Sequence, residues 1–593
     1  MHTSDILYGS LALCAIFIIL YRLFQLHRSW LRLLITLNLE EKQQRYWGKD
    51  GYFQARVKKF LVVAPLFRKR HNKEFTGWKS LNFGTIPSRL HAIFLVLYLA
   101  SNVIYCCLLD YRQQPKAALI AEARGRTGHL AIMNMLPLFL FAARNNPLIS
   151  VLGIPFDSFN LFHRWIGRVV VMESFAHTFL WGVNNHDALG MEGLTRRLMH
   201  DQFLIYGFVS AIALVLILIQ SLSFIRHSFY EIFLHLHQFL VLGVTVGVLL
   251  HCRTHNLPQK PLAYTLLAIW AFERASRLTR ILSNLGTRLD VEALPENACR
   301  LTFHIPRKWE QKASQYVYIY IPSVSLWMSH PFSVASISSD VPPGNCQPRT
   351  EVSLIVAARS GMTRKLFTKA MNSPNSTLSL RAFVEGPYQN PGSGNLKSYG
   401  TVVLFAGGVG VTCQLPHLKD ILAESQAGRA ATRKLVLVWA VRNVEMIGWA
   451  RHLLDEIKKL SEKGKERQKH CKLEVLIFVS RHPSPHPPAT PSSETDIECM
   501  AVQRKCIADV HERISELKFG QDYVSRLMGE YKEHVEHRRI NVKDVVRKQF
   551  EERIGAMSIG VCGPGRFGDD VRDASRKLMT SGMLDFWEEA FTW

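Results

Sequence analysis

Long apolar stretches dominate the first half of this 593-residue chain and are nearly absent from the second half. Crossing a bilayer as a helix takes about 18 to 25 apolar residues. Stretches of that length lie at 7–26, 87–109, 129–150, 162–183, 203–223, 230–252 and 262–281. The first stretch lacks a basic region before it and a clear cleavage site, so we expect an anchor there. The pattern predicts a helical transmembrane domain of about seven spans over residues 1–284, followed by a water-soluble half.

The second half opens with short segments in which apolar and polar residues alternate. "SQYVYIYIP" (314–322) and "EVSLIVAAR" (351–359) have the period of two that is typical of β-strands. "TVVLFAGGVGVTCQLPHL" (401–418) then reads as an apolar strand, a glycine turn and a helix, which is the start of a nucleotide-binding α/β domain. We therefore expect a β domain over 285–396 and an α/β domain over 397–593.

A proline-rich segment interrupts the expected α/β domain. "PSPHPPATPSSETD" (483–496) holds five prolines among small polar residues and predicts a disordered linker. It opens a charged insertion at about 482–553, which we expect to be partly disordered, with a helix around 514–537. We assign this insertion no chemistry and expect regular structure to resume at residue 557.

The charge of the chain, formally +24, fits a membrane protein. Residues 28–89 carry fourteen Lys or Arg against four acids, and short basic loops stay on the cytosolic side. With seven spans, this places the N-terminus outside and the C-terminal half in the cytosol. Because the basic residues are spread out and no nucleic-acid motif accompanies them, we expect no nucleic-acid partner.

Two histidine pairs repeat one spacing within the apolar half. His163 and His177 are fourteen residues apart, and so are His237 and His251. Fourteen helical residues rise about 21 Å and end only about 40° short of four full turns. Each pair therefore lies on one face of its helix, with one histidine near each side of the membrane. Two such helices side by side place His163 opposite His237 and His177 opposite His251, which is the requirement for two bis-histidine haems.

Other polar residues in these helices have open interpretations. A single membrane histidine can instead be a hydrogen-bonding residue, and His235 replaces His237 if the helix register differs. Arg164 and Arg168 near the inner level suit haem propionates, although the preference of basic residues for the cytosolic side explains them equally well. Glu173 lies near mid-span, where an acid is expected to face the bundle interior.

A motif in the second half resembles a known family. "HPFSVAS" (330–336) is similar to the flavin-contact sequence of ferredoxin-reductase-type flavoproteins, in the variant carried by ferric reductases and NADPH oxidases. The resemblance implies an antiparallel β-barrel that binds FAD over 285–396. It also implies Phe332 against the flavin, Ser333 near its reactive nitrogen, and His330 and Pro331 beside it, with His330 toward the ribityl or phosphate side.

Two further motifs follow in the order that the family has them. "ARSGMT" (358–363) resembles the turn and helix start beneath the FAD pyrophosphate, which implies that Gly361 and Thr363 contact it. "EGPYQN" (385–390) resembles the family's Gly-Pro-Tyr-Gly turn at Gly386 and Pro387. Gln389 stands where glycine is usual, and each motif taken alone could be an ordinary turn.

The turn after the apolar strand at 401 resembles the nicotinamide-binding turn of the same superfamily. Cys413 replaces the third glycine of the strict dinucleotide fingerprint. The residues that match are Gly407, Gly408, Gly410 and Thr412.

The next strand ends in Arg442, which suits the 2′-phosphate of NADPH, whereas an acid there would favour NADH. "CGP" at Cys562, Gly563 and Pro564 matches the family turn whose cysteine lies near the nicotinamide. By resemblance Trp593 covers the flavin, although it could equally belong to an amphipathic last turn.

The order of these motifs, together with "ARNNPLISVLGI" and "HRWIGR" in the membrane half, resembles fungal-type ferric-chelate reductases of the flavocytochrome b superfamily. This implies an oxidoreductase with FAD, NADPH and two haem b groups that passes electrons to external ferric chelates, with Cu(II) as a further acceptor. A superoxide-forming NADPH oxidase would share the same electron path. A histidine-rich metal transporter would not need the flavin and nicotinamide motifs.

The resemblance also implies a location and a partner system. We expect a multi-pass protein of the plasma membrane, or alternatively of the vacuolar membrane, that serves iron uptake. Functional coupling to an iron permease and oxidase would follow from that role.

Overall fold

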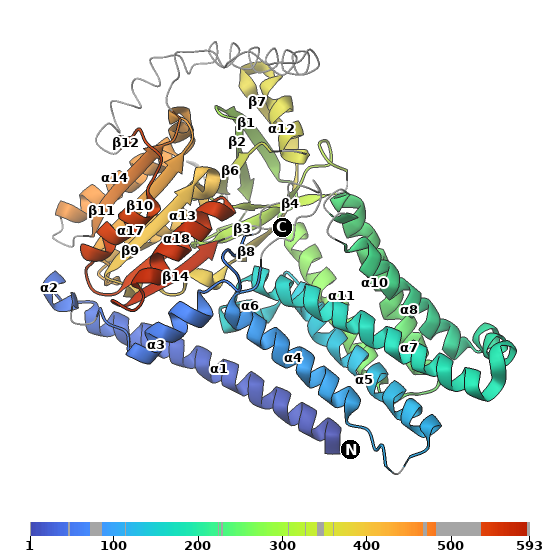
Figure 1. The fold of residues 1–593 in the computed structure, drawn as a ribbon. Helices are drawn as coiled ribbons and strands as arrows, with labels where there is room; N and C mark the ends of the chain where they lie inside the picture. The colour runs from blue at the N-terminus through green and yellow to red at the C-terminus, as the bar shows by residue number, and fades with distance from the viewer. Residues whose placement is uncertain are drawn as a thin grey trace, which may run out of the picture. The chain divides into compact units, whose positions relative to one another are not determined.

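The computed structural model describes most of the chain as two compact units (Figure 1). The first unit contains the described residues up to His27 and those from Phe60 to Arg280, and the second contains Arg28–Lys59 and the described residues from Ile281 onward. The described residues are 2–45, 48–71, 86–112, 114–222, 225–226, 229–305, 307–326, 328–340, 349–359, 361–466, 471–481 and 535–589.

Helices build the first unit. Their bounds are α1 His2–Thr36, which runs on into the second unit, α4 Arg89–Cys107, α5 Lys116–Ala142, α6 Pro147–Leu152, α7 Phe156–His200, α8 Gln202–Gln220, α10 Tyr230–Thr254 and α11 Lys260–Leu282. Side chains cap several of them: Ser88 accepts a hydrogen bond from the backbone N–H of His91 at the start of α4, and Asp201 accepts one from Phe203 at the start of α8. In α7 the helical path breaks at Gly190, whose φ is 68°.

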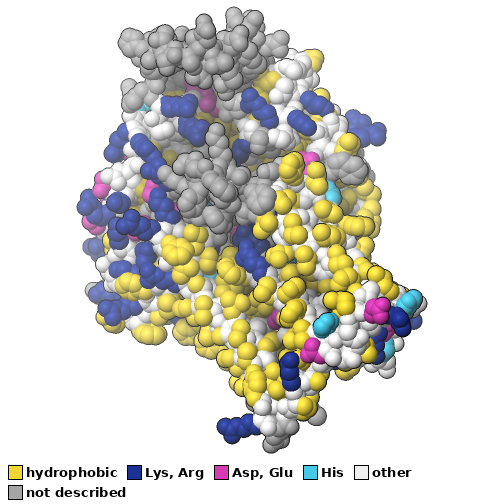
Figure 2. Space-filling model, turned by 45° about the vertical axis from the view of Figure 1, so that its right-hand side comes forward, with side chains coloured by type: hydrophobic (Ala, Val, Ile, Leu, Met, Phe, Trp, Pro, Cys, Tyr) yellow, Lys and Arg dark blue, Asp and Glu magenta, His cyan; other side chains and the backbone are white. Residues whose placement is uncertain are grey.

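Six of the seven predicted spans fall on single long helices, whereas 129–150 covers the end of α5, a short break and part of α6. The count of seven is not confirmed. Among the described residues, four helical segments are long and apolar enough to cross a membrane: Ala12–Thr36, Arg89–Cys107, Gln202–Gln220 and Tyr230–Thr254. Hydrophobic side chains cover much of the surface of this helical unit (Figure 2), including Phe17, Leu97, Val209 and Phe239. Such a surface is unfavourable in water and suits a bilayer.

The inner faces of five helices share one apolar core. It includes Met135 of α5, Val170 of α7, Leu214 of α8, Val244 of α10 and Leu266 of α11. The core fixes how α7 and α10 face one another inside the unit.

Two antiparallel sheets form the β part of the second unit and share a core. One has the order β5-β6-β2-β1-β7 and the other the order β4-β3-β8. Their bounds are β1 Arg288–Leu294, β2 Ala298–Ile305, β3 Gln315–Tyr320, β4 Ser329–Ser333, β5 Ser336–Asp340, β6 Arg349–Ala357, β7 Thr377–Arg381 and β8 Phe383–Gln389. Val317 and Val384 of the smaller sheet pack with Leu301 of the larger one, and helix α12 (Met362–Met371) adds Leu366 to this core.

A six-stranded parallel sheet is the centre of the α/β part of the second unit, in the order β12-β11-β10-β9-β13-β14. Its strands are β9 Thr401–Gly407, β10 Lys434–Val441, β11 Lys472–Val479, β12 Val535–Glu536, β13 Met557–Cys562 and β14 Leu584–Glu589. The helices between them are α13 Val411–Gln426, α14 Arg451–Glu466, α17 Val542–Glu551 and α18 Gly565–Leu578. The central strands β9 and β13 are buried along their full length, as is typical of a parallel sheet covered on both faces.

Regular structure resumes earlier than the sequence predicts. β12 pairs in parallel with β11, and α17 packs beside α18. Helix α17 is amphipathic and buries Val542, Val546 and Phe550. Because of this pairing and this buried face, residues 535–553 belong to the α/β domain and not to an insertion. The apolar residues of α17 repeat at helical spacing, which explains the buried face. The predicted linker at 483–496 lies outside the described residues, as does most of the helix predicted at 514–537.

Candidate functional site

The four histidines singled out by their spacing meet in two pairs. On α7 and α10, His163 faces His237 with ring centroids 6.3 Å apart, and His177 faces His251 at 6.5 Å. The planes of the paired rings are inclined by 69° and 90°. It is His237, rather than its neighbour His235, that lies against His163.

Hydrogen bonds to the backbone orient three of these four rings. Nδ1 lies 2.9 Å from the Leu138 carbonyl oxygen in His163, 2.8 Å from that of Arg124 in His177, and 2.8 Å from that of Phe203 in His251. A carbonyl oxygen only accepts, so each Nδ1 carries the proton. The lone pair is then on Nε2, the nitrogen that can bind a metal. Among the described residues, Nδ1 of His237 has no hydrogen-bond partner.

Two glycines make room for the rings of the outer pair. In a helix the carbonyl of residue i accepts from the N–H of residue i+4, so the carbonyls of Arg124 and Phe203 are covered by residues 128 and 207. Both positions are glycine, and a Cβ there would lie 2.5 Å from Nδ1 of His177 and 2.8 Å from Nδ1 of His251. Any other residue would push the imidazole away from its carbonyl.

Gly128→Ala should therefore displace His177 and lower the amount of haem that the outer pair would hold. Overpacking of this kind costs about 1–3 kcal/mol, and here it falls on a predicted metal ligand. The haem-to-protein ratio and the redox difference spectrum of the purified protein measure the effect. Gly182→Ala on α7 is the matched control, since nothing lies within 4 Å of a Cβ at that position. An unchanged haem ratio in Gly128→Ala would show that the ring does not need this space.

The residues present fit haem. Two imidazoles on opposite sides of one metal ion, each bound through nitrogen at about 2 Å, have ring centroids about 6.3 Å apart. Both observed separations are close to that value. Near the inner pair, the buried Nε of Arg164 has no hydrogen-bond partner among the described residues, and Arg168 and Arg226 are close enough to repel it. Such a cluster suits the carboxylates of haem propionates.

A buried polar network lies beside the histidines on α7. Asn134 Nδ2 donates to Asn102 Oδ1 at 2.7 Å and to both carboxylate oxygens of Glu173 at 3.0 Å. All three side chains are buried, and they come from α4, α5 and α7. Glu173 thus faces the bundle interior, where the Asn134 amide of α5 donates to its carboxylate.

In the second unit, the structure brings two of the recognised motifs together. Ser333, at the end of β4, has its hydroxyl 3.2 Å from the thiol of Cys413 at the start of α13. Cys413 in turn hydrogen-bonds Cys562 at the end of β13. That hydrogen bond and burial raise the pKa of Cys562, so its thiol stays protonated and neutral. The flavin motif and the nicotinamide motif therefore share one junction.

Sequence reasoning missed three polar residues at this junction. Ser314 bonds to Nε2 of His417 at 2.9 Å and donates to Glu589, and His417 lies 3.5 Å from the same carboxylate. His417 and Glu589 are only 2% and 1% exposed. They lie far apart in sequence, and no role was predicted for any of them from the sequence, although Ser314 opens the strand predicted at 314–322 and His417 lies in the helix predicted after the glycine turn. The group offers a buried hydroxyl, imidazole and carboxylate that can hold or move a proton.

Close backbone contacts explain two glycines of the nicotinamide turn. A Cβ on Gly407 would lie 2.7 Å from Cδ of Pro564, and one on Gly410 would lie 2.2 Å from the carbonyl oxygen of Cys562. Gly408 has a φ of 55°, which favours glycine. Thr412 is buried in the first turn of α13 and donates to the carbonyl of Val409. The two turns can approach only because these positions lack side chains.

The remaining flavin motifs lie at turns and strand ends. Gly361 precedes α12 with a φ of 63°, and Thr363 accepts a hydrogen bond from the N–H of Arg359. Gly386 and Pro387 belong to β8, where a Cβ on Gly386 would lie 2.9 Å from Val317 of β3. The other residues of this set, which share strand β4 with Ser333, are His330, Pro331 and Phe332.

Two arginines lie together at the carboxyl edge of the parallel sheet. Arg442 follows β10 and Arg481 follows β11, and the Arg481 N–H donates to the Arg442 carbonyl at 2.9 Å. Ser480 lies between β11 and Arg481, and all three residues are exposed. Arg442 was expected from the sequence, but Arg481 and Ser480 were not, because their proximity to it depends on strand order.

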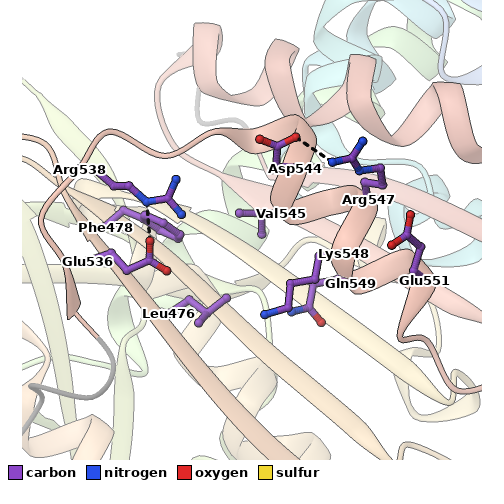
Figure 3. Close-up of a pocket in the computed structure, with 10 residues that line it drawn as sticks. All are labelled: Leu476, Phe478, Glu536, Arg538, Asp544, Val545, Arg547, Lys548, Gln549 and Glu551. Atoms are coloured by element: carbon purple, nitrogen blue, oxygen red, sulfur yellow. Dashed lines mark hydrogen bonds and ion pairs between the residues drawn. The ribbon is translucent and has the colours of Figure 1, made fainter.

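A cavity of about 370 Å³ lies elsewhere, at the β12 edge of the sheet (Figure 3). Phe478, Arg538, Asp544 and Lys548 are among its lining residues, and its arginines are paired: Arg538 with Glu536 at 2.6 Å and Arg547 with Asp544 at 3.4 Å. None of the motif residues lines it, so we assign it no role in coenzyme binding. Trp593, expected over the flavin, lies outside the described residues.

Three families match successive parts of the chain. Residues 127–248 match the family described as "Ferric reductase like transmembrane component". Residues 284–392 match the family "FAD-binding domain", and residues 399–576 match the family "Ferric reductase NAD binding domain". In the order in which they occur, the three matched regions make this chain similar to ferric reductases over most of its length. The two histidine pairs lie within or next to the first matched region, and the Ser333–Cys413 contact joins the second and third.

Members of the family in fungi match along most of this chain. A probable ferric reductase transmembrane component of Candida albicans is 24% identical over 92% of this chain and 77% of its own length. Ferric/cupric reductase transmembrane component 2 of Saccharomyces cerevisiae is 25% identical over 91% and 71%. Among solved structures, the Amycolatopsis cytochrome P450 reductase GcoB is 15% identical and covers 51% of this chain and 69% of its own, with a TM-score of 0.30, which is too low to support an inference.

Proposed function

We propose that this protein is a ferric-chelate reductase that takes electrons from NADPH on one side of a membrane and delivers them to ferric chelates on the other. The observation that carries the proposal is the two facing histidine pairs at two levels of α7 and α10. Two metal sites at different depths provide a path through a layer that charged reductants do not cross.

The residues of the chain have distinct tasks in this proposal. A bound flavin supplies the conversion of a two-electron hydride donor into single electrons, and bis-histidine haems carry those electrons singly. Ser333 and the neutral thiol of Cys562 border the place where nicotinamide and flavin meet. The carbonyl hydrogen bonds of His163, His177 and His251 leave Nε2 of each ring available for a metal, and the Arg164 guanidinium would pair with haem propionates at the inner level.

The choice of NADPH over NADH depends on residues at the carboxyl edge of the parallel sheet. Arg442 and Arg481 offer the positively charged donors that a 2′-phosphate requires, and this favours NADPH over NADH.

The topology and the acceptor are also part of the proposal. The basic residues of 28–89 favour a cytosolic position for this loop and for the second unit, with the acceptor outside, in the plasma membrane or alternatively the vacuolar membrane. The names of the relatives mention ferric and cupric reduction, so Cu(II) is included as an acceptor. Reduction of iron at the surface would serve uptake by a coupled permease and oxidase.

The test is NADPH-driven formation of Fe(II) from a ferric chelate by membranes that contain the protein. It is run under argon and again in air with superoxide dismutase, beside membranes without the protein. We expect activity that persists under argon and resists the dismutase, because electrons reach iron directly. Loss of iron reduction under argon, with superoxide formed in air, would instead make the protein an NADPH oxidase.

A further inference from the structure

Residues 28–59, the first part of the connection between the first two predicted spans, belong to the second unit. Arg32, near the end of α1, donates to the Ser398 hydroxyl at 2.7 Å and lies over the Tyr399 ring at 3.9 Å. Gln44 of α2 (Glu41–Gln44) is 1% exposed and donates to the Ala431 carbonyl. The Gly48 carbonyl accepts from the N–H of Met583 at 2.6 Å. A segment that only linked two helices would not bury such contacts.

The strongest contacts of this segment converge on one carboxylate of the last described strand. Lys58, which follows α3 (Tyr52–Val57), lies 2.5 Å from Asp585 and 2.8 Å from Asp50, and the Tyr399 hydroxyl donates to Asp585 at 2.5 Å. The Asp50 side chain is only 1% exposed. Burial opposes the charge of Lys58, but Asp585 and Asp50 outweigh it and raise the lysine pKa.

Strand β14 connects this ion pair to the candidate site. Asp585 and Glu589 are four residues apart on it, which spans about 13 Å of strand. Glu589 contacts Ser314 and His417, and its neighbour Glu588 pairs with the buried Arg572. β14 is an edge strand that pairs only with β13 among the described strands, so side-chain contacts must hold its other edge.

We propose that residues 28–59 are a positioning element of the nicotinamide domain: through the Lys58–Asp585 pair they hold β14, and with it Glu589, in register at the junction of flavin and nicotinamide. The first cytosolic connection would then set the geometry of hydride transfer without touching the coenzyme. This inference rests on the proposed function.

The test is Lys58→Met in the full-length protein, measured as anaerobic reduction of the bound flavin by saturating NADPH. Because a small displacement of a positioned group costs rate, we expect the first-order rate constant to fall about tenfold. The NADPH concentration at half-maximal rate should stay within about twofold, because the arginines at the sheet edge are untouched. Lys58→Arg keeps the charge and should restore most of the rate.

Controls separate positioning from loss of folding. Lys59→Met is matched, since Lys59 is adjacent and makes an exposed contact with Thr580. Asp585→Asn should reproduce the defect, and the double variant with Lys58→Met should be no worse than either alone. A Lys58→Met rate within twofold of wild type, or a loss of FAD that matches the loss of rate, would overturn the inference. Wild-type flavin that NADPH does not reduce would contradict the proposed function itself.

Discussion

Replacing His177 by alanine should abolish electron transfer to an external ferric chelate while NADPH still reduces the flavin. The imidazole is one of two facing rings at the outer level, and its backbone hydrogen bond leaves Nε2 for the metal. Alanine offers no ligand, so haem would not be held at the outer level and the proposed path would end at the inner pair. Anaerobic Fe(II) formation by membranes and stopped-flow flavin reduction measure the two halves separately.

Two comparisons make this result specific. His186→Ala is the matched control, because His186 lies on the same helix α7 but is half-exposed and pairs only weakly with Asp187 at 3.8 Å. His163→Ala should also stop external reduction, but by removing the inner haem. Full iron reduction by His177→Ala would refute the proposed electron path through the outer pair.

Replacing both Arg442 and Arg481 by alanine should remove the preference for NADPH over NADH. A hydrogen bond to a charged group contributes about 1.5–3 kcal/mol, so each arginine changes the NADPH affinity by roughly 10-fold to 150-fold. The KM for NADPH should rise accordingly, whereas NADH, which lacks the 2′-phosphate, should be used about as well as before. Steady-state kinetics with both coenzymes give the ratio.

The control for this pair is Arg538→Ala, which removes a positive charge from the cavity at the β12 edge. It should leave the ratio of NADPH to NADH use unchanged. An equal loss with both coenzymes in the double variant would mean that the arginines support folding or general electrostatics, and not phosphate recognition.

Local geometry made much of the membrane site predictable. The helical repeat alone places His163 and His177 on one face, because fourteen residues make almost four turns. The choice between His235 and His237 could not be made in that way. It depends on the rotation of α10 about its own axis, which the packing of α7, α8 and α10 around Val170, Leu214 and Val244 determines.

Contacts between residues that are far apart in the sequence could not be predicted from it. Ser314 and Glu589 are 275 residues apart and meet only because β3 and β14 are brought together by the fold. Arg481 lies beside Arg442 because β11 pairs with β10, and the sequence of neither strand predicts this pairing. The docking of residues 28–59 likewise depends on surfaces formed by the last third of the chain.

The prediction of a surface insertion at α17 is wrong, because it follows the charge of that segment and not the spacing of its apolar residues. The segment containing α17, "VKDVVRKQFE", is rich in Lys, Arg and acids and was interpreted as part of a surface insertion. Its apolar residues Val542, Val546 and Phe550 recur at intervals of four, which predicts an amphipathic helix. That signal was present in the sequence and is the one that the buried face of α17 follows.

The place of β14 in the chain has a consequence for biosynthesis. A ribosome releases the chain from its N-terminus, so the histidine-bearing helices are made long before Asp585 and Glu589 emerge on this strand. Until β14 pairs with β13, neither the Lys58 ion pair nor the Ser314–His417–Glu589 group can form. The junction of flavin and nicotinamide would therefore be completed only after the last described strand has been made and has paired with β13.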